Sequence, residues 1–304
     1  MGAFFEILNS LQLEVDIYHN AKFCGRFEIS ESKLGKTVFH LVFSGECLLE
    51  IPGEEPTVLE EGDLVLFPKE IPHTLKAIPN AELERDWQDC GERQESLVHT
   101  TSRPGMGMLC GEFRLNGPLQ TAFLESLPEF IILCHKEFTK EKSNWLLFIK
   151  DLLYEESKSQ SLLTDVVVNK LSEALFSKVL EYELKQNKMS QFLSLYSHDE
   201  LCIAVDAFHE KPHEDWTIER MASICNTSRA RFAQLFKQVS SWTPHRYMVW
   251  WRMQLAYHAF KRGDTVSQVC EQTGYYSEAS FIRVFKREFS ATPSQFKKQW
   301  KQKL

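Results

Sequence analysis

The sequence lacks the long hydrophobic runs and the export signal that would place a chain in or across a membrane. One of its longer apolar runs, Phe130-Ile131-Ile132-Leu133, falls far short of the roughly 18–20 residues that a membrane span needs. The amino terminus reaches Glu6 without a basic segment followed by an apolar one, so we expect no signal peptide. We therefore predict no membrane partner and a cytoplasmic location.

Cysteine pairs at the spacing of a metal knuckle or a disulfide scaffold are also missing. The 304 residues include eight cysteines, none of them in a CxxC arrangement, which favours reduced thiols. A hydrophobic share of 43% with 25% charged residues excludes disordered and collagen-like proteins. At this length the chain can form two hydrophobic cores.

Charge is unevenly distributed along the chain. The net charge is −7, yet residues 216–304 contain 15 Lys and Arg against 5 Asp and Glu. The remaining residues are therefore strongly acidic. Nucleic-acid binding depends on the charge of the local surface and not on that of the whole chain. The basic segment is therefore compatible with a polyanionic partner and equally with a surface that is only solvated.

Pattern and composition divide the chain into residues 1–118, 119–196 and 197–304. The first part has short β-branched and aromatic runs at 38–43, 47–51 and 64–67, bounded by turn signals such as Ser44-Gly45 and Pro52-Gly53. Several short strands at this spacing predict an antiparallel sandwich or barrel.

The middle part, residues 119–196, has no glycine and shows helical periodicity. Its two apolar stripes are Trp145, Phe148, Ile149 and Leu152, and Leu171, Leu175, Val179 and Tyr182. We expect these stripes to pack internally. Pairing of two copies of the chain through this segment is the alternative.

The last part contains an internal repeat. Eight positions recur 49 residues later, namely Ser228, Phe232, Leu235, Phe236, Lys237, Ser241, Thr243 and Pro244 as Ser277, Phe281, Val284, Phe285, Lys286, Ser290, Thr292 and Pro293. Each copy reads as a helix, a tight turn and a second helix. The residues expected to cap or end these helices are Asn226, Ser228, Thr265 with Gln268, Gly274 and Ser277. The sequence thus predicts two helix-turn-helix units in tandem.

Two arginines stand where a helix designed only for folding would avoid them. Arg229 and Arg231 fall in the first turn of the second helix, where the macrodipole disfavours a cation by about 0.3–1 kcal/mol. Positive charge at this position is explained if phosphate oxygens approach the helix.

These residues resemble the DNA-binding domain of AraC/XylS-type regulators. The matching runs are 216–222, 228–237 and 274–286, with Arg252 in the joining helix and Thr292-Pro293 near the end. Ser241 and Ser290 stand where the family usually has glycine, and Tyr275 where it usually has phenylalanine. The resemblance implies a promoter-binding regulator, with RNA polymerase as a further partner and activation as the expected outcome.

The resemblance also implies that the second helix of each unit enters a major groove of double-stranded DNA. The expected DNA-binding residues are Arg229, Ala230, Arg231, Ala233, Gln234, Lys237, Arg252, Glu278, Ala279, Ile282, Arg283, Lys286 and Arg287. Gln suits adenine and Arg suits guanine, so Gln234 and Arg283 are our candidates for base readout. The other cations are candidates for phosphate contacts.

The front part resembles a cupin. Residues 62–73, ending in His73, look like the second cupin motif, and residues 39–46, including His40, look like a reduced first motif. A cupin oxygenase usually supplies two histidines and a carboxylate from its first motif. Val42 occupies one of those positions here, which weakens the case for an enzyme.

Residues 109–119 and 124–128 resemble the cupin-bearing subgroup of these regulators, in which some members respond to reactive chlorine species. Cys24 and Cys110 match the positions of the cysteines in the oxidant-responsive members. With His40 and His73 they would form a Cys2His2 site, a ligand set that favours zinc, and their oxidation to a disulfide would release the metal. Inert packing of lone cysteines is the alternative.

The sequence therefore predicts an α+β chain with a cupin-like barrel, a helical linker and an all-α DNA-binding domain. Its expected function is a transcriptional regulator, without catalytic residues, whose barrel senses an oxidant or a small molecule. The competing hypothesis is a dioxygenase-type cupin metalloenzyme with an accessory DNA-binding domain.

Overall fold

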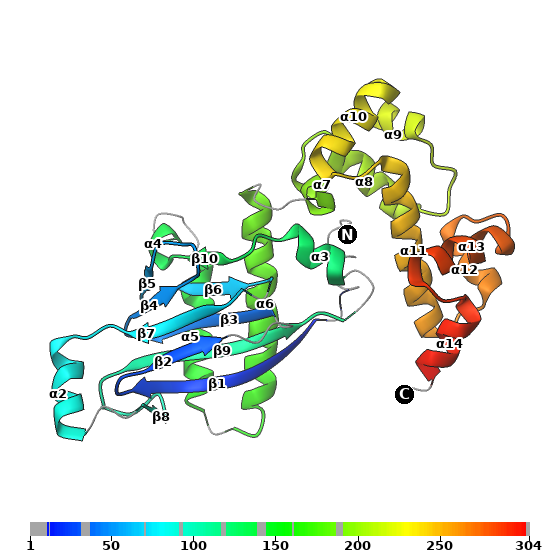
Figure 1. Cartoon of the computed structure of the whole chain (residues 1–304). Coiled ribbons are helices and arrows are strands. Elements are labelled where there is room, and N and C mark those ends of the chain that lie inside the picture. The colour runs from blue at the N-terminus through cyan, green and yellow to red at the C-terminus, as the bar shows by residue number, and fades with distance from the viewer. Residues whose placement is uncertain are drawn as a thin grey trace. The chain divides into compact units, whose positions relative to one another are not determined.

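The computed structural model describes residues 11–301 apart from 12, 32–36, 70, 91–93, 117–119, 139–143, 160 and 187–190 (Figure 1). The described residues form two compact units. The barrel unit comprises residues 13–115 and 127–182, and the helical unit comprises residues 116–126 and those from 183 onward. The boundary predicted between 118 and 119 lies outside the described residues.

Two antiparallel sheets build the barrel unit. The six-stranded sheet has the order β10-β6-β3-β9-β1-β8, and the four-stranded sheet the order β2-β7-β4-β5 (Figure 1). The strands are β1 (Glu14–Cys24), β2 (Glu28–Glu31), β3 (Thr37–Ser44), β4 (Cys47–Glu50), β5 (Thr57–Leu59), β6 (Leu64–Phe67), β7 (His73–Ala77), β8 (Glu95–Leu97), β9 (Met106–Arg114) and β10 (Ile131–Leu133). The strands predicted at 38–43, 47–51 and 64–67 correspond to β3, β4 and β6.

The central strands are buried on both faces. Val42 of β3 and Met108 of β9 contribute to the apolar cluster between the sheets, together with Leu49 and Leu75 of the smaller sheet. On the other face, Phe113 packs 4.6 Å from Phe176 between ring centroids. Because both faces are covered, these strands read as near-continuous apolar runs instead of alternating ones.

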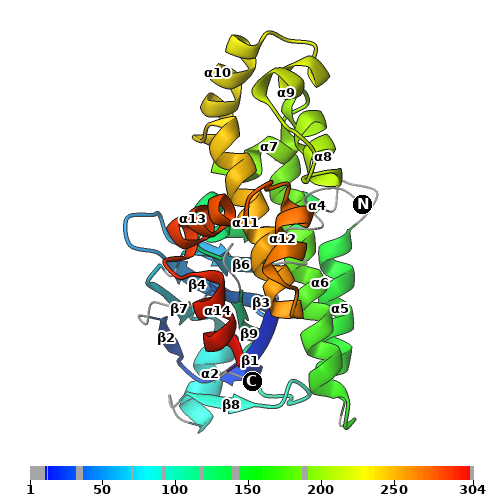
Figure 2. The same ribbon diagram turned by 90° about the vertical axis from the view of Figure 1, so that its right-hand side faces the viewer.

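Two helices, α5 (Trp145–Ser157) and α6 (Thr164–Lys185), cover the outer face of the larger sheet (Figure 2). Phe43 of β3 meets Tyr154 of α5 edge to face, with centroids 5.4 Å apart. Three shorter helices are α2 (Ala81–Cys90), α4 (His135–Phe138) and, in the helical unit, α3 (Gln120–Ser126). No helix among the described residues combines the length and the apolar character that crossing a membrane would require.

The apolar stripe predicted on α5 is only partly internal. Leu175 and Val179 of α6 are buried as expected, but Phe148 is 66% exposed and Leu152 is 42% exposed. The expectation of internal packing is therefore wrong for these two side chains. The helical spacing of apolar residues identifies an apolar stripe. It does not show whether that stripe packs against the same chain or against another one.

The helical unit contains the two predicted helix-turn-helix units. Its main helices are α7 (Ser194–Ser197), α8 (Leu201–Glu210), α9 (Ile218–Ile224), α10 (Arg229–Ser240), α11 (Pro244–Arg262), α12 (Val266–Thr273), α13 (Glu278–Phe289) and α14 (Pro293–Lys301) (Figure 1). A short 3-10 turn at Gln191–Leu193 precedes α7. The linking helix α11 packs Tyr247 against Phe236 and Phe260 against Phe285.

The capping signals read from the sequence are confirmed. The Ser228 hydroxyl accepts a hydrogen bond from the Arg231 amide, and Thr265 forms a full capping box with Gln268. Gly274 and Asn226 adopt left-handed backbone conformations, with φ of 71° and 51°. Local side-chain chemistry therefore fixes where these helices begin and end.

Serine ends both second helices in a conformation that suits glycine. Ser241 has φ of 63° and Ser290 has φ of 55°, both in the left-handed region where a Cβ atom is unfavourable. These are the positions where the resembling family usually has glycine. The helices still end there, at a cost in conformational energy.

We predict that Ser241→Gly stabilises the protein by about 1 kcal/mol, since glycine adopts the left-handed conformation without the steric cost. Urea unfolding of the full chain measures the change. The control is Ser240→Gly, which removes the hydroxyl that accepts from the Trp242 amide and should destabilise. A Ser241→Gly chain that is no more stable than wild type would contradict the prediction.

Candidate functional site

The outward face of α10 presents polar side chains. Phe232 and Phe236 face the core, and the sequence-predicted residues Arg229, Ala230, Arg231, Gln234 and Lys237 are exposed, while Ala233 is half-buried. This division follows the helical period, because residues four apart share a face. Gln234 is thus free to reach a base edge from the second turn of the helix.

The outward face of α13 is similar. Phe281 and Phe285 are buried, and the predicted residues Glu278, Ala279, Arg283, Lys286 and Arg287 are exposed. Ile282 is half-buried and packs against the apolar cluster of the second unit, which makes it a poorer candidate for DNA contact. The Arg283 Nε atom donates to the Ala279 carbonyl at 3.3 Å, which orients the guanidinium along the helix.

The two arginines at the start of α10 have acidic partners. Arg229 Nε lies 2.9 Å from a carboxylate oxygen of Glu219, and Arg231 lies 3.9 Å from Glu200. These ion pairs offset part of the macrodipole cost without any phosphate. Both arginine side chains are about two-thirds exposed, however, and exposed pairs contribute little, so both remain able to exchange a carboxylate for a phosphate.

Arg252 makes contacts within the helical unit. Its Nε atom donates to the Pro212 carbonyl and its Nη2 atom to the Glu214 carbonyl, each at 2.8 Å. These bonds engage two nitrogen atoms of the guanidinium, and the predicted contact of Arg252 with DNA stays a prediction. Sequence position on the basic linking helix could not distinguish an internal contact from an external one.

The two cupin histidines meet inside the barrel. His40 Nε2 and His73 Nε2 are 2.8 Å apart, and His73 Nδ1 lies 3.0 Å from the Ile71 carbonyl. Since that carbonyl only accepts, His73 Nδ1 carries a proton, and His40 Nε2 then donates to His73 Nε2. Burial, with the His73 ring as a smaller cause, holds the pKa of His40 well below its usual value.

The register of the strands separates the two predicted redox cysteines. Cys110 pairs with His40 on one side and with His19 of β1 on the other, whereas Cys24 lies opposite Glu95. Cys24 lies five positions beyond His19 along β1, which corresponds to roughly 17 Å. A disulfide requires Cα atoms within about 7 Å, so this register does not permit a Cys24–Cys110 bond.

The predicted zinc site is also not assembled. Within the described ranges, no three His, Cys, Asp or Glu side chains are placed to hold one metal ion. The direct His40–His73 hydrogen bond joins the two Nε2 atoms that would act as ligands. The Cys2His2 set is corrected accordingly, because the resemblance aligned residues along the chain but gave no register between β1 and β9.

Burial disfavours the thiolate form of several cysteines. Burial raises the pKa of Cys24, and it raises that of Cys47 to about 12. Cys134, Cys202, Cys225 and Cys270 are shifted upward by the same cause. The side chain of Cys90 lies outside the part that the structure describes.

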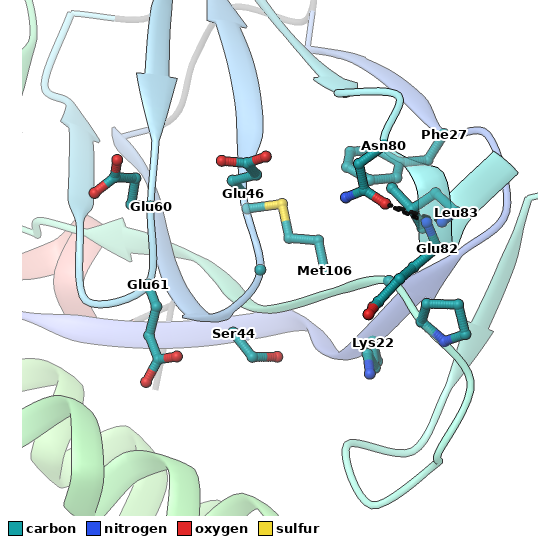
Figure 3. A pocket seen from close by; sticks show the side chains of 13 residues that line it. Lys22, Phe27, Ser44, Glu46, Glu60, Glu61, Asn80, Glu82, Leu83 and Met106 are labelled. Atoms are coloured by element: carbon teal, nitrogen blue, oxygen red, sulfur yellow. Dashed lines mark hydrogen bonds between the residues drawn. The ribbon is translucent and has the colours of Figure 1, made fainter.

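A pocket of about 550 Å³ in the barrel unit was not predicted (Figure 3). Its polar lining includes Lys22, Glu46, Glu60, Glu61 and Glu82, and its apolar lining includes Phe27, Leu83 and Met106. In the sequence, residues 62–73 are assigned only to the second cupin motif. The lining residues are spread over 85 positions of the chain, so the sequence contains no local pattern from which the pocket could be predicted.

The turn that lines the pocket also binds the helices behind it. Glu61 accepts a hydrogen bond from the buried Lys150 of α5 at 2.9 Å, and Glu60 pairs with Lys136 of α4. Asp63 accepts from both the amide and the ring of His135. A displacement of this turn would therefore be transmitted to α4 and α5.

Comparison with known proteins gives two family matches. Residues 3–184 match the family described as Cupin, and residues 221–299 match the family described as a helix-turn-helix domain. The first match alone covers more than half of the chain.

Full-length relatives are transcriptional regulators. An HTH-type transcriptional regulator of Haemophilus influenzae is 30% identical and covers 94% of this chain and 95% of its own length. The RCS-specific HTH-type transcriptional activator RclR of Escherichia coli K12 is 32% identical over 87% of this chain and 85% of its own. The DNA-binding domain of AdpA in complex with DNA has a TM-score of 0.34 and 21% identity, covering 35% of this chain and 96% of that domain.

The register makes a prediction about oxidation. Treatment of the native full chain with hypochlorous acid should yield no Cys24–Cys110 disulfide, while addition of urea before the oxidant should allow it, because the strands must separate first. Mass spectrometry of peptides from unreduced protein measures the bond. Rapid formation in the native chain, in step with loss of free thiol, would contradict this register.

Proposed function

Because the chain belongs to the AraC-type transcriptional regulators with a cupin domain and a DNA-binding helix-turn-helix domain, we propose that α10 and α13 read promoter DNA and that the barrel unit senses an effector. The observation that carries the DNA part is the repeat itself. Two capped helix-turn-helix units each present an exposed polar face on the second helix. We call α10 and α13 the reading helices.

The division of labour on the reading helices follows side-chain chemistry. Gln234 is proposed to bind adenine and Arg283 guanine, while Arg229, Arg231, Lys237, Lys286 and Arg287 contact phosphates. Ala230, Ala233 and Ala279 suit thymine methyl groups, and Glu278 suits cytosine. Ile282 is the weakest member because its side chain packs inward.

A regulator is favoured over an enzyme. The full-length relatives are regulators, and the described barrel residues do not bring three metal-binding side chains together. Activation through RNA polymerase is the proposed output, supported by the relative named as an activator. A protein that binds promoters must be in the same compartment as the DNA. We therefore include a cytoplasmic location in the proposal.

The effector is proposed to be an oxidant or a small molecule. A relative described as RCS-specific supports an oxidant, and the pocket beside the 60–63 turn supports a small molecule. An oxidant would act by a route other than a Cys24–Cys110 disulfide in the folded barrel, because the strand register keeps these two residues apart. For a small molecule, the links from Glu60 and Glu61 to Lys136 and Lys150 supply a route to the helices.

The readout proposal predicts two classes of variant. Gln234→Ala or Arg283→Ala should cost about 1–3 kcal/mol at the preferred site and relax base preference at one position, whereas Lys286→Ala should weaken binding to all sequences equally. Selection of duplexes from a random library, followed by titration at fixed salt, measures both effects. An unchanged base preference in both readout variants would show that other residues read the bases.

We further propose that the chain forms a homodimer through the outer face of α5 and the start of α6. Phe148 and Leu152 lie exposed on α5, Leu163 lies exposed directly before α6, and Val166 and Val167 lie exposed in its first turn. Burying such side chains contributes about 1.5–3 kcal/mol each, and exposed large apolar side chains that gather on one face mark interfaces.

Phe148→Glu should convert the dimer to a monomer at micromolar concentration, because the interface would then bury an unpaired charge. Sedimentation velocity of the full chain measures the mass. Val58→Glu, which charges another exposed apolar side chain of the barrel unit, is the matched control. A wild-type chain that sediments as a monomer would disprove the dimer.

A further inference from the structure

The loop between α8 and α9, residues 211–216, lies against the turn of the second helix-turn-helix unit. A Cβ atom built on Gly274 would come within 2.4 Å of the His213 carbonyl oxygen and 2.9 Å of its carbon. Gly274 also needs its φ of 71° to end α12. Glycine therefore serves two purposes here, because it permits both the left-handed turn and the close approach of a backbone from the other unit.

Arg252 fixes the middle of this loop from the linking helix. Its guanidinium donates to the carbonyls of Pro212 and Glu214, which flank His213. The two donors belong to one planar guanidinium, so they hold the two carbonyls at a fixed distance and angle. The ammonium group of a lysine has no such planar arrangement of donors. The contact is half-buried and thus less weakened by solvent than a surface hydrogen bond.

The far end of the loop is held by one residue from each helix-turn-helix unit. Arg220 of α9 donates from Nη1 to the Asp215 carbonyl at 3.0 Å, and its guanidinium stacks 4.1 Å above the Trp216 ring. Tyr276, directly before the N-cap of α13, donates its hydroxyl to the Asp215 carboxylate at 2.7 Å. Asp215 thus connects the helix before α10 to the turn before α13.

We propose that this loop is a strut that sets the separation and angle of the two reading helices, and that Arg252, Gly274, Asp215 and Tyr276 are positioning residues for the spacing of the two DNA half-sites. The inference rests on the proposed DNA readout by α10 and α13. Besides this loop, α11 connects the two helix-turn-helix units. A single helix leaves freedom at both of its ends, whereas a second connection removes it.

Spacing is a sharp test of rigidity because B-DNA is helical. Inserting one base pair moves a half-site by about 3.4 Å along the axis and rotates it by roughly 34°. A rigid pair of reading helices should therefore reject sites that are one base pair longer or shorter. A loosened pair should accept them while still reading the same bases.

The experiment is in vitro selection with the full chain on a random duplex library, followed by sequencing and titration on duplexes with the selected spacing and with one base pair more or less. The variants are Gly274→Ala, Arg252→Gln, Asp215→Asn and Tyr276→Phe. Tyr257→Phe is the matched control, a tyrosine of α11 whose ring packs against Phe289 and Phe296.

Wild type and Tyr257→Phe should select one spacing. In Gly274→Ala and Arg252→Gln, the ratio of the affinity for that spacing to the affinity for the altered spacings should fall at least three-fold. The half-site bases that these variants select should stay the same. Asp215→Asn and Tyr276→Phe should lower the affinity ratio less, and their double variant should match the worse single variant because they share one hydrogen bond. If circular dichroism shows that Gly274→Ala or Arg252→Gln does not fold, the exposed pair Asp215→Asn and Tyr276→Phe provides the test.

Full wild-type discrimination in the folded variants would overturn the strut. So would an equal loss of affinity at every spacing, since that pattern would mean that these residues touch the DNA backbone. Failure of the proposed function is distinguishable, because the wild-type chain would then enrich no sequence at all.

Discussion

The helical unit depends on one shared element, the linking helix α11. Its amino-terminal half supplies Tyr247, Trp250 and Trp251 to the core of the first helix-turn-helix unit, and its carboxyl-terminal half supplies Phe260 to the core of the second. Each small unit could bury little apolar surface by itself. Packing on a common helix gives both of them a core and gives one chain two reading helices.

The barrel unit follows a different constraint. Its central strands are covered on both faces, by the smaller sheet and by α5 and α6, so a buried polar group must find a partner inside. His40 and His73 satisfy this condition by hydrogen bonding to each other. Glu60 and Glu61, in the turn beside the pocket, contact both solvent and the helices.

Features set by local chemistry were predictable from the sequence, and features set by register or by covering surfaces were not. The repeat, the caps at Ser228 and Thr265 and the left-handed turns depend only on neighbouring residues, and all of them are observed. The Cys24–Cys110 pairing failed because family position does not specify which residues of β1 and β9 face each other. The roles of Arg252 and Phe148 were missed because a basic or apolar position on a helix does not reveal what lies against it.

The most direct test of the account is hydroxyl-radical footprinting of the full chain on a duplex obtained by selection. Two reading helices on one rigid linking helix predict two protected patches on the same face of the DNA, about one helical turn apart. A single protected patch, or two on opposite faces, would contradict the claim that both α10 and α13 enter the major groove together.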